Sequence, residues 1–310
     1  MTDERSSLNP TQRRTLELLR RPAEPPEPVG DVVDGLVALL EDGLGPLVDV
    51  IETPNRLVLH KHALAGLNAC EASWMAERAS FAWSTRTARG TVVHKAIELA
   101  VHWHGEPIPG ELVEHAVERL AASDRSIASY LGALDPAERA ELVAACVDLV
   151  SKFQECVPPL RAAFRPVSES RVEAKFLDGR VVLTGVVDLT LGRPDGDRPG
   201  KVILDYKTGQ VHAAHREDLR FYALLEAVRL GVPPRLVATL ELDSGTVHHE
   251  TVTPALLEAA ARRVVDTARR LAALDHLGAE PVRRPGPRCR WCPIASGCEP
   301  GKAWLAGDDR

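Results

Sequence analysis

The middle of the chain contains its strongest β-strand pattern. Three runs rich in β-branched residues lie within 166–209, and helical patterns flank them on both sides. Asp178-Gly179 separates the first two runs, and this dipeptide favours a tight hairpin turn. A loop rich in glycine and proline at 192–200 separates the second run from the third. We therefore expect the three runs to be neighbouring strands of one sheet.

Helical patterns fill most of the remaining chain, at 31–104, 111–157, 216–230 and 254–274. A second hairpin is predicted at 235–252, and the stretch from 281 is expected to be a loop that carries cysteines. This order predicts an α/β or α+β fold, with helices around a central sheet that holds the chemistry. Residues 1–30 end in the proline-rich "RRPAEPPEPVG" and are predicted to be a flexible segment, with one domain over 31–310.

Composition limits the class of protein. The chain has 310 residues, of which 45% are hydrophobic, so it can bury a sizeable core. No apolar run reaches the roughly 18 residues of a membrane-spanning helix. The charged N-terminus has no apolar core of the kind found in signal peptides. We therefore expect a cytoplasmic protein that does not contact membranes and keeps its six cysteines reduced.

The net charge of −6 does not decide whether the protein binds nucleic acid, because phosphate binding depends on the local field. The arginine-rich segment "RRPGPRCR" at 283–290 is a candidate for phosphate contacts. Its arginines are Arg283, Arg284, Arg288 and Arg290. The alternative is that the segment is a solvated surface.

The third β-rich run, "KVILDYKTG" at 201–209, ends in charged residues. Asp205 and Lys207 share one face of this strand, because side chains two residues apart point the same way. If 192–200 closes a hairpin, residues whose numbers sum to about 393 face each other, and Asp188 faces Asp205. Two carboxylates about 5 Å apart repel unless a cation lies between them, and such oxygen ligands suit Mg²⁺ or Mn²⁺. Taken alone, the strand end also fits a surface salt bridge.

Four segments occur in a recognisable order: "GTVVHKAIE", "GVVDLTL", "LDYKTG" and "DLRFYALL". In this order they resemble the RecB-like branch of the PD-(D/E)XK nuclease superfamily, over roughly residues 70–300. The resemblance implies a restriction-endonuclease-like mixed β-sheet flanked by helices, and cleavage of DNA with Mg²⁺ or Mn²⁺. It implies that Lys207, Asp205 and Asp188 are catalytic. It also implies that the metal is held by His94, Asp188, Asp205 and the backbone carbonyl of Tyr206.

Further residues are expected to support this site. Tyr222 matches the helix motif of the family, whereas Asp218 stands where the family usually has glutamine. We expect this departure to affect how DNA is held rather than the metal chemistry. Glu98 lies four residues after His94 on the same helix face, so it is a candidate to orient His94. Glu173 fits an outer carboxylate of the site and an exposed strand residue equally well.

Three cysteines lie within ten residues in "CRWCPIASGC", a spacing that indicates a metal centre with a fourth ligand elsewhere. Cys146 and Cys156 fall in a helical pattern and are expected in the core. Iron–sulfur members of the resembled family include the CRISPR adaptation nucleases and AddB-type subunits. They carry one cysteine before the histidine motif and three near the C-terminus. The matching residues here are Cys70, Cys289, Cys292 and Cys298, which implies a [4Fe–4S] cluster, although Zn²⁺ fits four thiols nearly as well.

These features together predict a metal-dependent DNA nuclease with a structural cluster. We expect an exonuclease or end-processing enzyme that favours single strands, in DNA repair, recombination or CRISPR adaptation. The sequence has no nucleotide-hydrolysis motif, so a helicase or another repair or adaptation protein is an expected partner. Two alternatives stay open: a non-catalytic DNA-binding module on the same fold, and a protein-interaction module whose four cysteines hold zinc.

Overall fold

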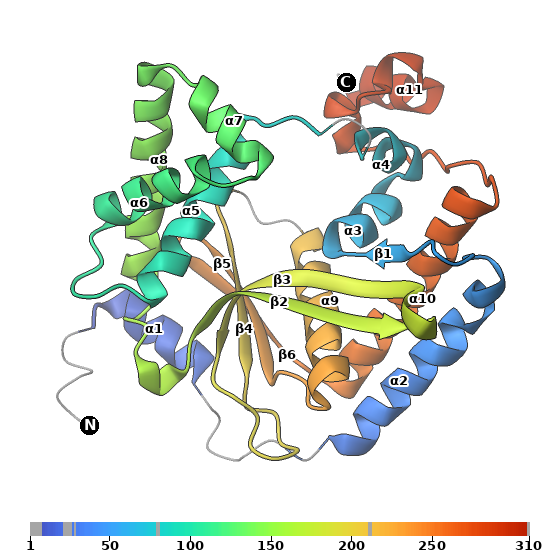
Figure 1. The fold of residues 1–310 in the computed structure, drawn as a ribbon, viewed down its shortest axis with the longest axis horizontal. Coiled ribbons are helices and arrows are strands. Elements are labelled where there is room, and N and C mark those ends of the chain that lie inside the picture. Colours follow the sequence, from blue (N-terminus) through green and yellow to red (C-terminus); the bar gives the residue numbers. More distant parts are fainter. Residues whose placement is uncertain (1–7, 21–26, 28, 79–80, 210–212, 309–310) are drawn as a thin grey trace.

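The computed structural model describes residues 8–20, 27, 29–78, 81–209 and 213–308. Within these residues the strands form a mixed six-stranded sheet with the order β1-β3-β4-β5-β6, and β2 pairs with β3 (Figure 1). The strands are β1 (Leu57–Leu59), β2 (Val167–Phe176), β3 (Val181–Leu191), β4 (Val202–Lys207), β5 (Leu236–Glu241) and β6 (Thr246–Thr251). The predicted α/β fold, with a mixed sheet between helices, is confirmed.

Strand β3 organises the sheet. Its whole length pairs with β2 on one edge, so β1 and β4 share the other edge. Strand β4 pairs antiparallel with the end of β3, with Leu189 opposite Leu204 and Thr190 opposite Ile203. These residue numbers sum to 393, so the predicted register is confirmed. Asp188 lies one residue beyond the last pair, at the point where β3 and β4 separate.

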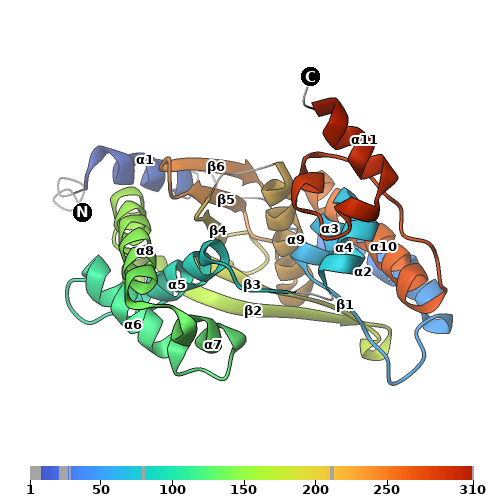
Figure 2. The ribbon, with the colours of Figure 1, turned by 90° about the horizontal axis from the view of Figure 1, so that it is seen from above.

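Two groups of helices cover the sheet (Figure 2). One group contains α2 (Gly30–Leu44), α3 (Lys61–Ala69), α4 (Glu71–Glu77), α9 (Ala213–Leu230) and α10 (Pro254–His276). The other contains α1 (Pro10–Leu19), α5 (Thr85–Val101), α6 (Pro109–Ala121), α7 (Ser126–Ala133) and α8 (Pro136–Cys156). Short 3-10 turns are η1 (Gly45–Asp49), η2 (Ala162–Phe164), η3 (Leu177–Gly179), η4 (Pro287–Trp291) and η5 (Ala295–Gly297), and α11 (Glu299–Asp308) ends the described chain.

The alternation of side chains along β4 assigns each face of the sheet to one helix group. Ile203 packs in the core that also contains residues of α2, α9 and α10, whereas Leu204 and Tyr206 pack in the core of α5, α6 and α8. Asp205 therefore lies on the α9 side and Tyr206 on the α5 side. The strand end can consequently contact residues from both groups of helices.

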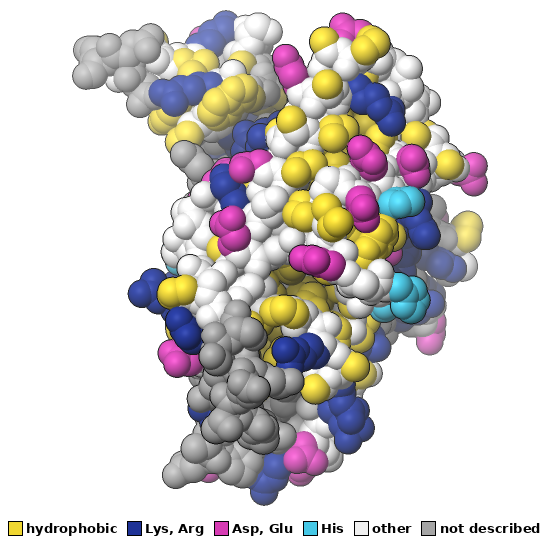
Figure 3. Space-filling view, turned by 90° about the vertical axis from the view of Figure 1, so that its left-hand side faces the viewer, with side chains coloured by type: hydrophobic (Ala, Val, Ile, Leu, Met, Phe, Trp, Pro, Cys, Tyr) yellow, Lys and Arg dark blue, Asp and Glu magenta, His cyan; other side chains and the backbone are white. Residues whose placement is uncertain are grey.

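The charge of the surface is mixed on one side of the molecule. In the face that Figure 3 shows, acidic and basic side chains are interspersed among apolar ones. Mixed charge on this face agrees with the small net charge of −6. None of the helices that the structure describes is long and apolar enough to cross a membrane.

The structure differs from the sequence-based expectation in two connecting regions. Strand β1 lies inside 31–104, which we expected to be helical, and pairs parallel with β3. Its three residues are too few to produce a detectable alternation in the sequence. The stretch from 281 is more ordered than the predicted loop, because it contains η4, η5 and α11.

The predicted flexible segment 1–30 contains an ordered helix. A capping box formed by Asn9 and Gln12 begins α1, and both side chains also donate hydrogen bonds to backbone carbonyls of α8. Leu19 packs with the residues of the α8 core. Helix α1 is therefore docked on the domain, while residues 1–7, 21–26 and 28 lie outside the described residues. The domain boundaries themselves stay a prediction.

Candidate active site

The predicted catalytic residues meet where β3 and β4 separate. A cleft of about 610 Å³ lies there, between α5 and the ends of these strands. His94 and Lys207 line this cleft, and Asp188 and Asp205 are buried behind them, with 4% and 1% of their surface exposed. The structure thus brings together all the residues to which the sequence assigned catalysis.

His94 lies between two carboxylates. Its Nδ1 atom is 3.5 Å from Asp188 Oδ1 and 3.4 Å from Glu169 Oε1. Burial favours the neutral imidazole, but these two carboxylates outweigh it and raise the pKa of His94 to about 10. The same imidazole, together with Lys61 and Lys207, holds the pKa of Asp188 below its usual range against the effect of burial. The carboxylates of Asp188 and Glu169 therefore favour a positive charge between them.

Glu169 is a site residue that the sequence interpretation missed. Pairs on either side of it, Ser168 with Leu189 and Ser170 with Val187, place it opposite Asp188. Their numbers sum to 357, as do those of Asp178 and Gly179 at the predicted turn. Centring the hairpin on that turn would have located Glu169. Its backbone φ of 47° is a left-handed conformation that non-glycine residues rarely adopt outside turns and functional sites.

Glu173 and Glu98 each pair with a lysine. Glu173 is exposed on β2 and forms an ion pair with Lys175, with 3.1 Å between Glu173 Oε1 and Lys175 Nζ. Glu98 lines the cleft but accepts a hydrogen bond of 2.8 Å from Lys95. Glu169 occupies the place beside His94 that we predicted for Glu98.

Two lysines hold the buried carboxylate of Asp205. Lys207 Nζ lies 2.9 Å from Asp205 Oδ1 and 2.7 Å from Oδ2, and Lys61 Nζ lies 3.4 Å from Oδ1. Burial and the neighbouring Asp188 raise the pKa of Asp205. Burial acts to lower the pKa of Lys61, but Asp205 and Asp188 outweigh it and raise that pKa. Lys61 begins α3, and no motif in the sequence marked it.

The two residues of the α9 motif lie beside Lys61. The Tyr222 ring centre is 5.0 Å from Lys61 Nζ. A methyl group added at Gly185 would lie 2.5 Å from this ring, so glycine at that position allows α9 to approach β3. Asp218 is buried, and burial raises its pKa to about 6 although Lys61 and Lys207 act to lower it. The supporting role that the sequence assigned to these two residues stays a prediction.

The side chains of the cleft fit a divalent cation. Ligand atoms of His94, Glu169 and Asp188 all lie within 4.8 Å of one another. Apart from their ion pairs, Glu169 Oε1 and Asp205 Oδ2 are buried oxygens without a hydrogen-bond donor. Carboxylate oxygens with one imidazole suit Mg²⁺ or Mn²⁺. Tyr206 contributes its backbone N–H, which donates a 3.1 Å hydrogen bond to Asp188 Oδ2, and a metal-binding role for its carbonyl stays a prediction.

The chain brings Cys70 next to the C-terminal stretch that carries the other three predicted cysteine ligands. Cys70 directly precedes α4, and its Sγ accepts a hydrogen bond from the backbone N–H of Arg284 at 3.5 Å. A methyl group added at Gly301 would lie 3.4 Å from Cys298 Sγ and 3.6 Å from Cys289 Sγ. Among the described residues, no three of these thiols lie within 4.8 Å of one another.

The remaining cysteines, Cys146 and Cys156, are buried in the α8 core as predicted. Burial raises the pKa of Cys146 to about 12. Such a thiol is a poor metal ligand, because metals bind the thiolate form.

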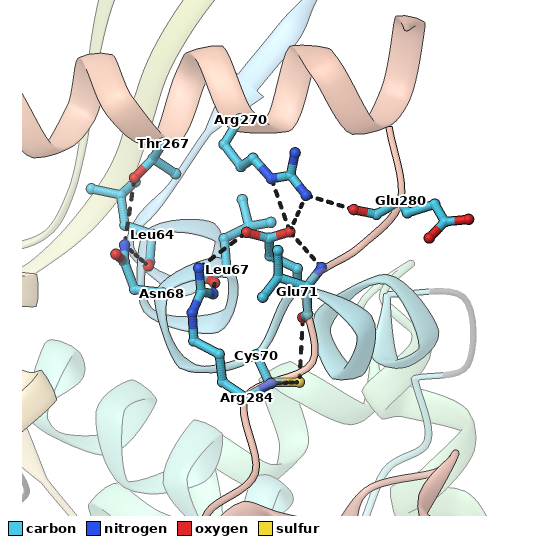
Figure 4. Close-up of polar contacts among 10 residues, drawn as sticks. Leu64, Leu67, Asn68, Cys70, Glu71, Thr267, Arg270, Glu280 and Arg284 are labelled. Atoms are coloured by element: carbon cyan, nitrogen blue, oxygen red, sulfur yellow. Dashed lines mark hydrogen bonds and ion pairs between the residues drawn. The ribbon is translucent and has the colours of Figure 1, made fainter. Parts of the chain in front are cut away.

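Glu71 fastens the C-terminal stretch to α4 (Figure 4). Its Oε2 atom accepts hydrogen bonds of 2.6 Å from Arg270 of α10 and 2.8 Å from the backbone N–H of Val282. Arg284 Nη2 lies 3.4 Å from Oε1 of the same carboxylate. Burial acts to raise the pKa of Glu71, but the hydrogen bonds from Arg270 and Val282 hold it below the ordinary value of 4.5. This charged cluster fixes the chain that leads to the three cysteines.

The same contacts change the interpretation of the arginine-rich segment. We predicted phosphate contacts there, but Arg284 pairs with Glu71, and Arg288 Nη2 lies 2.8 Å from both carboxylate oxygens of Glu77. These two arginines hold the segment against α4. The basic residues that line the cleft come from other parts of the chain and include Arg86, Lys95 and Arg125.

Comparisons with known proteins identify a family. A model of the PD-(D/E)XK nuclease superfamily matches residues 62–299 of this chain. No curated protein matches the chain. Among solved structures, the chain is similar to one titled "Crystal structure of SSO0001", with 14% sequence identity, a TM-score of 0.35, and coverage of 85% of this chain and 95% of that chain. The family match includes His94, both site strands and the four predicted cysteine ligands.

The pair Glu169 and Glu173 allows a direct test of the metal site. We expect Glu169→Ala to weaken binding of Mn²⁺ on the order of tenfold or more, because it removes one oxygen of the donor set. Glu173→Ala alters the same strand at an exposed position and should bind Mn²⁺ like the wild type. Calorimetric titration of each variant measures the difference. Equal affinity of both variants would exclude Glu169 from the site.

Replacement of Glu71 tests the charged cluster at the C-terminal stretch. We expect Glu71→Gln to lower the free energy of unfolding at pH 7 by about 1–3 kcal/mol, because buried charged hydrogen bonds are lost. A lowered carboxylate pKa contributes stability above the unfolded value of 4.5 and loses it as the pH falls through the folded pKa. The difference between wild type and Glu71→Gln should therefore shrink below pH 4.5, as followed by denaturant unfolding.

Glu258 provides the control for this experiment. It pairs with Arg262 on the exposed side of α10, where an ion pair contributes little. Glu258→Gln should leave the free energy of unfolding nearly unchanged both at pH 7 and below pH 4.5. A Glu71→Gln difference that stays constant with pH would show that the charge of Glu71 is not the source of the stability.

Proposed function

The chain belongs to the PD-(D/E)XK nuclease superfamily, and on this premise we propose that it is a Mg²⁺- or Mn²⁺-dependent deoxyribonuclease that hydrolyses phosphodiester bonds. Membership of the superfamily indicates a nuclease, with DNA as substrate. The observation that carries the proposal is the meeting of His94, Glu169 and the buried Asp188 at the wall of the cleft that Lys207 also lines. A protein that had kept only the fold would not need buried charges at this point, because removing charged groups from water is costly.

Each residue of the cleft has a role in this proposal. His94, Glu169 and Asp188 would hold the cation, with Asp205 and the Tyr206 carbonyl as further ligands from the family pattern. A bound cation of this kind lowers the pKa of a water molecule and so supplies a nucleophile near neutral pH. Asp205 orients the ammonium of Lys207 through contacts of 2.7 and 2.9 Å. Lys207 lines the cleft, where its charge would stabilise the negative charge that develops on the phosphate.

We further propose that the substrate is single-stranded DNA or a DNA end. Arg86 and Arg125 line the cleft and would contact the backbone phosphates. The biological setting we propose is the cytoplasm, in repair, recombination or CRISPR adaptation, with a helicase or another protein of these processes as partner. If the protein were instead a non-catalytic DNA-binding module, replacement of Lys207 would leave all of its activities unchanged.

A structural [4Fe–4S] cluster held by Cys70, Cys289, Cys292 and Cys298 is also part of the proposal. The support is the position of Cys70 beside the chain that leads to the other three thiols. In a tetrahedral zinc site, Zn–S bonds of about 2.3 Å place the sulfurs roughly 3.8 Å apart. A cubane cluster contains four iron atoms between the thiols and therefore needs wider spacing. The iron, sulfide and zinc content of the purified protein distinguishes the two kinds of centre.

Lys207 provides the test of catalysis. We expect Lys207→Ala to slow cleavage of end-labelled DNA by a factor on the order of 10² or more, with DNA binding nearly intact. Lys175→Ala removes an exposed lysine of β2 and should cleave at the wild-type rate. Cleavage by the wild type should require Mg²⁺ or Mn²⁺ and stop in EDTA. If Lys207→Ala cleaves as fast as Lys175→Ala, the assignment of catalysis to this cleft is wrong.

Two cysteine substitutions test the cluster. Cys70→Ala should give a colourless protein with a lower melting temperature and little nuclease activity, because metal ligation and folding are coupled. Cys146→Ala changes a buried core thiol and should keep the visible absorbance, the iron and sulfide content, and most of the activity. Full colour in Cys70→Ala would show that another group is the fourth ligand. Zinc without iron in the purified wild type would support the alternative centre.

A further inference from the structure

Two aromatic residues stand in the wall of the cleft on the segment that joins α4 to α5. Phe81 and Trp83 both line the cleft, and their ring centres lie 5.1 Å apart at an angle of 85°. Phe81 is 67% exposed and belongs to neither of the two cores formed by the described residues. Packing therefore does not explain why the chain has a large apolar ring at this position.

Trp83 holds this pair in place. Its indole N–H donates a 3.0 Å hydrogen bond to Ser126 of α7, and its ring lies 6.4 Å from the ring of Tyr130. Trp83 also packs against the α5–α8 core. A ring fixed in this way can serve as a binding surface without a large loss of conformational entropy. One side of the Phe81 ring contacts Trp83 edge to face. The 67% exposed fraction of Phe81 shows that much of the ring contacts solvent.

The charges around the two rings indicate the ligand. Arg86 and Arg125 line the same cleft as the rings, and the cleft continues to Lys207 and His94. A groove that combines cationic side chains with exposed aromatic rings matches a strand of nucleic acid whose bases are unpaired, because phosphates need positive charge and bases need a flat apolar surface. In a base-paired duplex the flat faces of the bases are stacked and cannot cover Phe81.

We propose that Phe81 and Trp83 form a platform on which a base of single-stranded DNA stacks while the neighbouring phosphate enters the cleft. This inference rests on the proposed nuclease function and specifies its substrate. The platform positions the strand and takes no part in the chemistry. It gives the cleft a preference for unpaired DNA that does not depend on base sequence, since every base has an aromatic face.

The experiment compares two oligonucleotides of equal length and charge, oligo-dT and the same chain with abasic sites. Binding is measured by fluorescence anisotropy in EDTA, so that no cleavage takes place. Phe81→Ala should weaken binding of oligo-dT roughly tenfold, which is within the range found when a stacking aromatic is removed, and should leave binding of the abasic chain unchanged. Phe81→Trp, which keeps an aromatic ring at this position, should bind oligo-dT like the wild type.

Leu277 supplies the matched control, because it is 65% exposed and lies beyond α10, outside the lining of the cleft. Leu277→Ala should bind both oligonucleotides like the wild type. Equal weakening of both oligonucleotides in Phe81→Ala would overturn the platform, because it would indicate a general disturbance of the cleft. Unchanged binding of oligo-dT would also overturn it.

These outcomes are separable from those for the nuclease function. If Lys207→Ala loses cleavage while Phe81→Ala binds oligo-dT like the wild type, the platform is wrong and the catalytic assignment stands. Loss of base-dependent binding in Phe81→Ala, with unchanged cleavage by Lys207→Ala, supports the platform and overturns the catalytic assignment.

Discussion

Two carboxylates buried side by side, those of Asp188 and Asp205, determine the organisation of the rest of the site. Each is almost fully removed from solvent, at the point where β3 and β4 separate. Burial of two neighbouring like charges is unfavourable unless cations and hydrogen-bond donors surround them. The fold supplies His94 from α5, Lys61 from α3 and Lys207 from β4. A divalent cation beside Asp188 would offset the same repulsion.

The site is completed only when both groups of helices pack on the sheet. His94 comes from the α5 side, whereas Lys61, Asp218 and Tyr222 come from the side of α3 and α9. These residues are separated by long stretches of chain, and their contacts are therefore non-local. We expect the charged centre to form late in folding, after the sheet has assembled.

Sequence reasoning located the parts of the site that follow from local geometry. The β3–β4 register could be predicted because a single loop joins the strands directly, and the position of Asp188 followed from it. His94 was found through its motif, since a histidine on a helix has no distinctive pattern of its own. Glu169 was missed although the Asp178-Gly179 turn fixes its position, because Glu173 is a second carboxylate on the same strand.

Other features depended on contacts that no local pattern records. Strand β1 is too short for periodicity, so the start of α3 and the position of Lys61 could not be inferred. The arginines at 283–290 form a basic segment in the sequence, but Glu71 and Glu77 lie about 200 residues away and neutralise part of it in the fold. Charge in a sequence indicates a binding surface only if the folded chain does not pair it.

Helix α3 connects two features that are distant in the sequence. Lys61, at its first residue, contacts Asp205, and Cys70, which follows its last residue, contacts the C-terminal stretch. Nine residues of α-helix form a rigid rod about 14 Å long. A displacement of the C-terminal stretch would therefore move the ammonium group at the other end of the rod. A change in the attachment of this stretch would therefore alter the contact between Lys61 and Asp205.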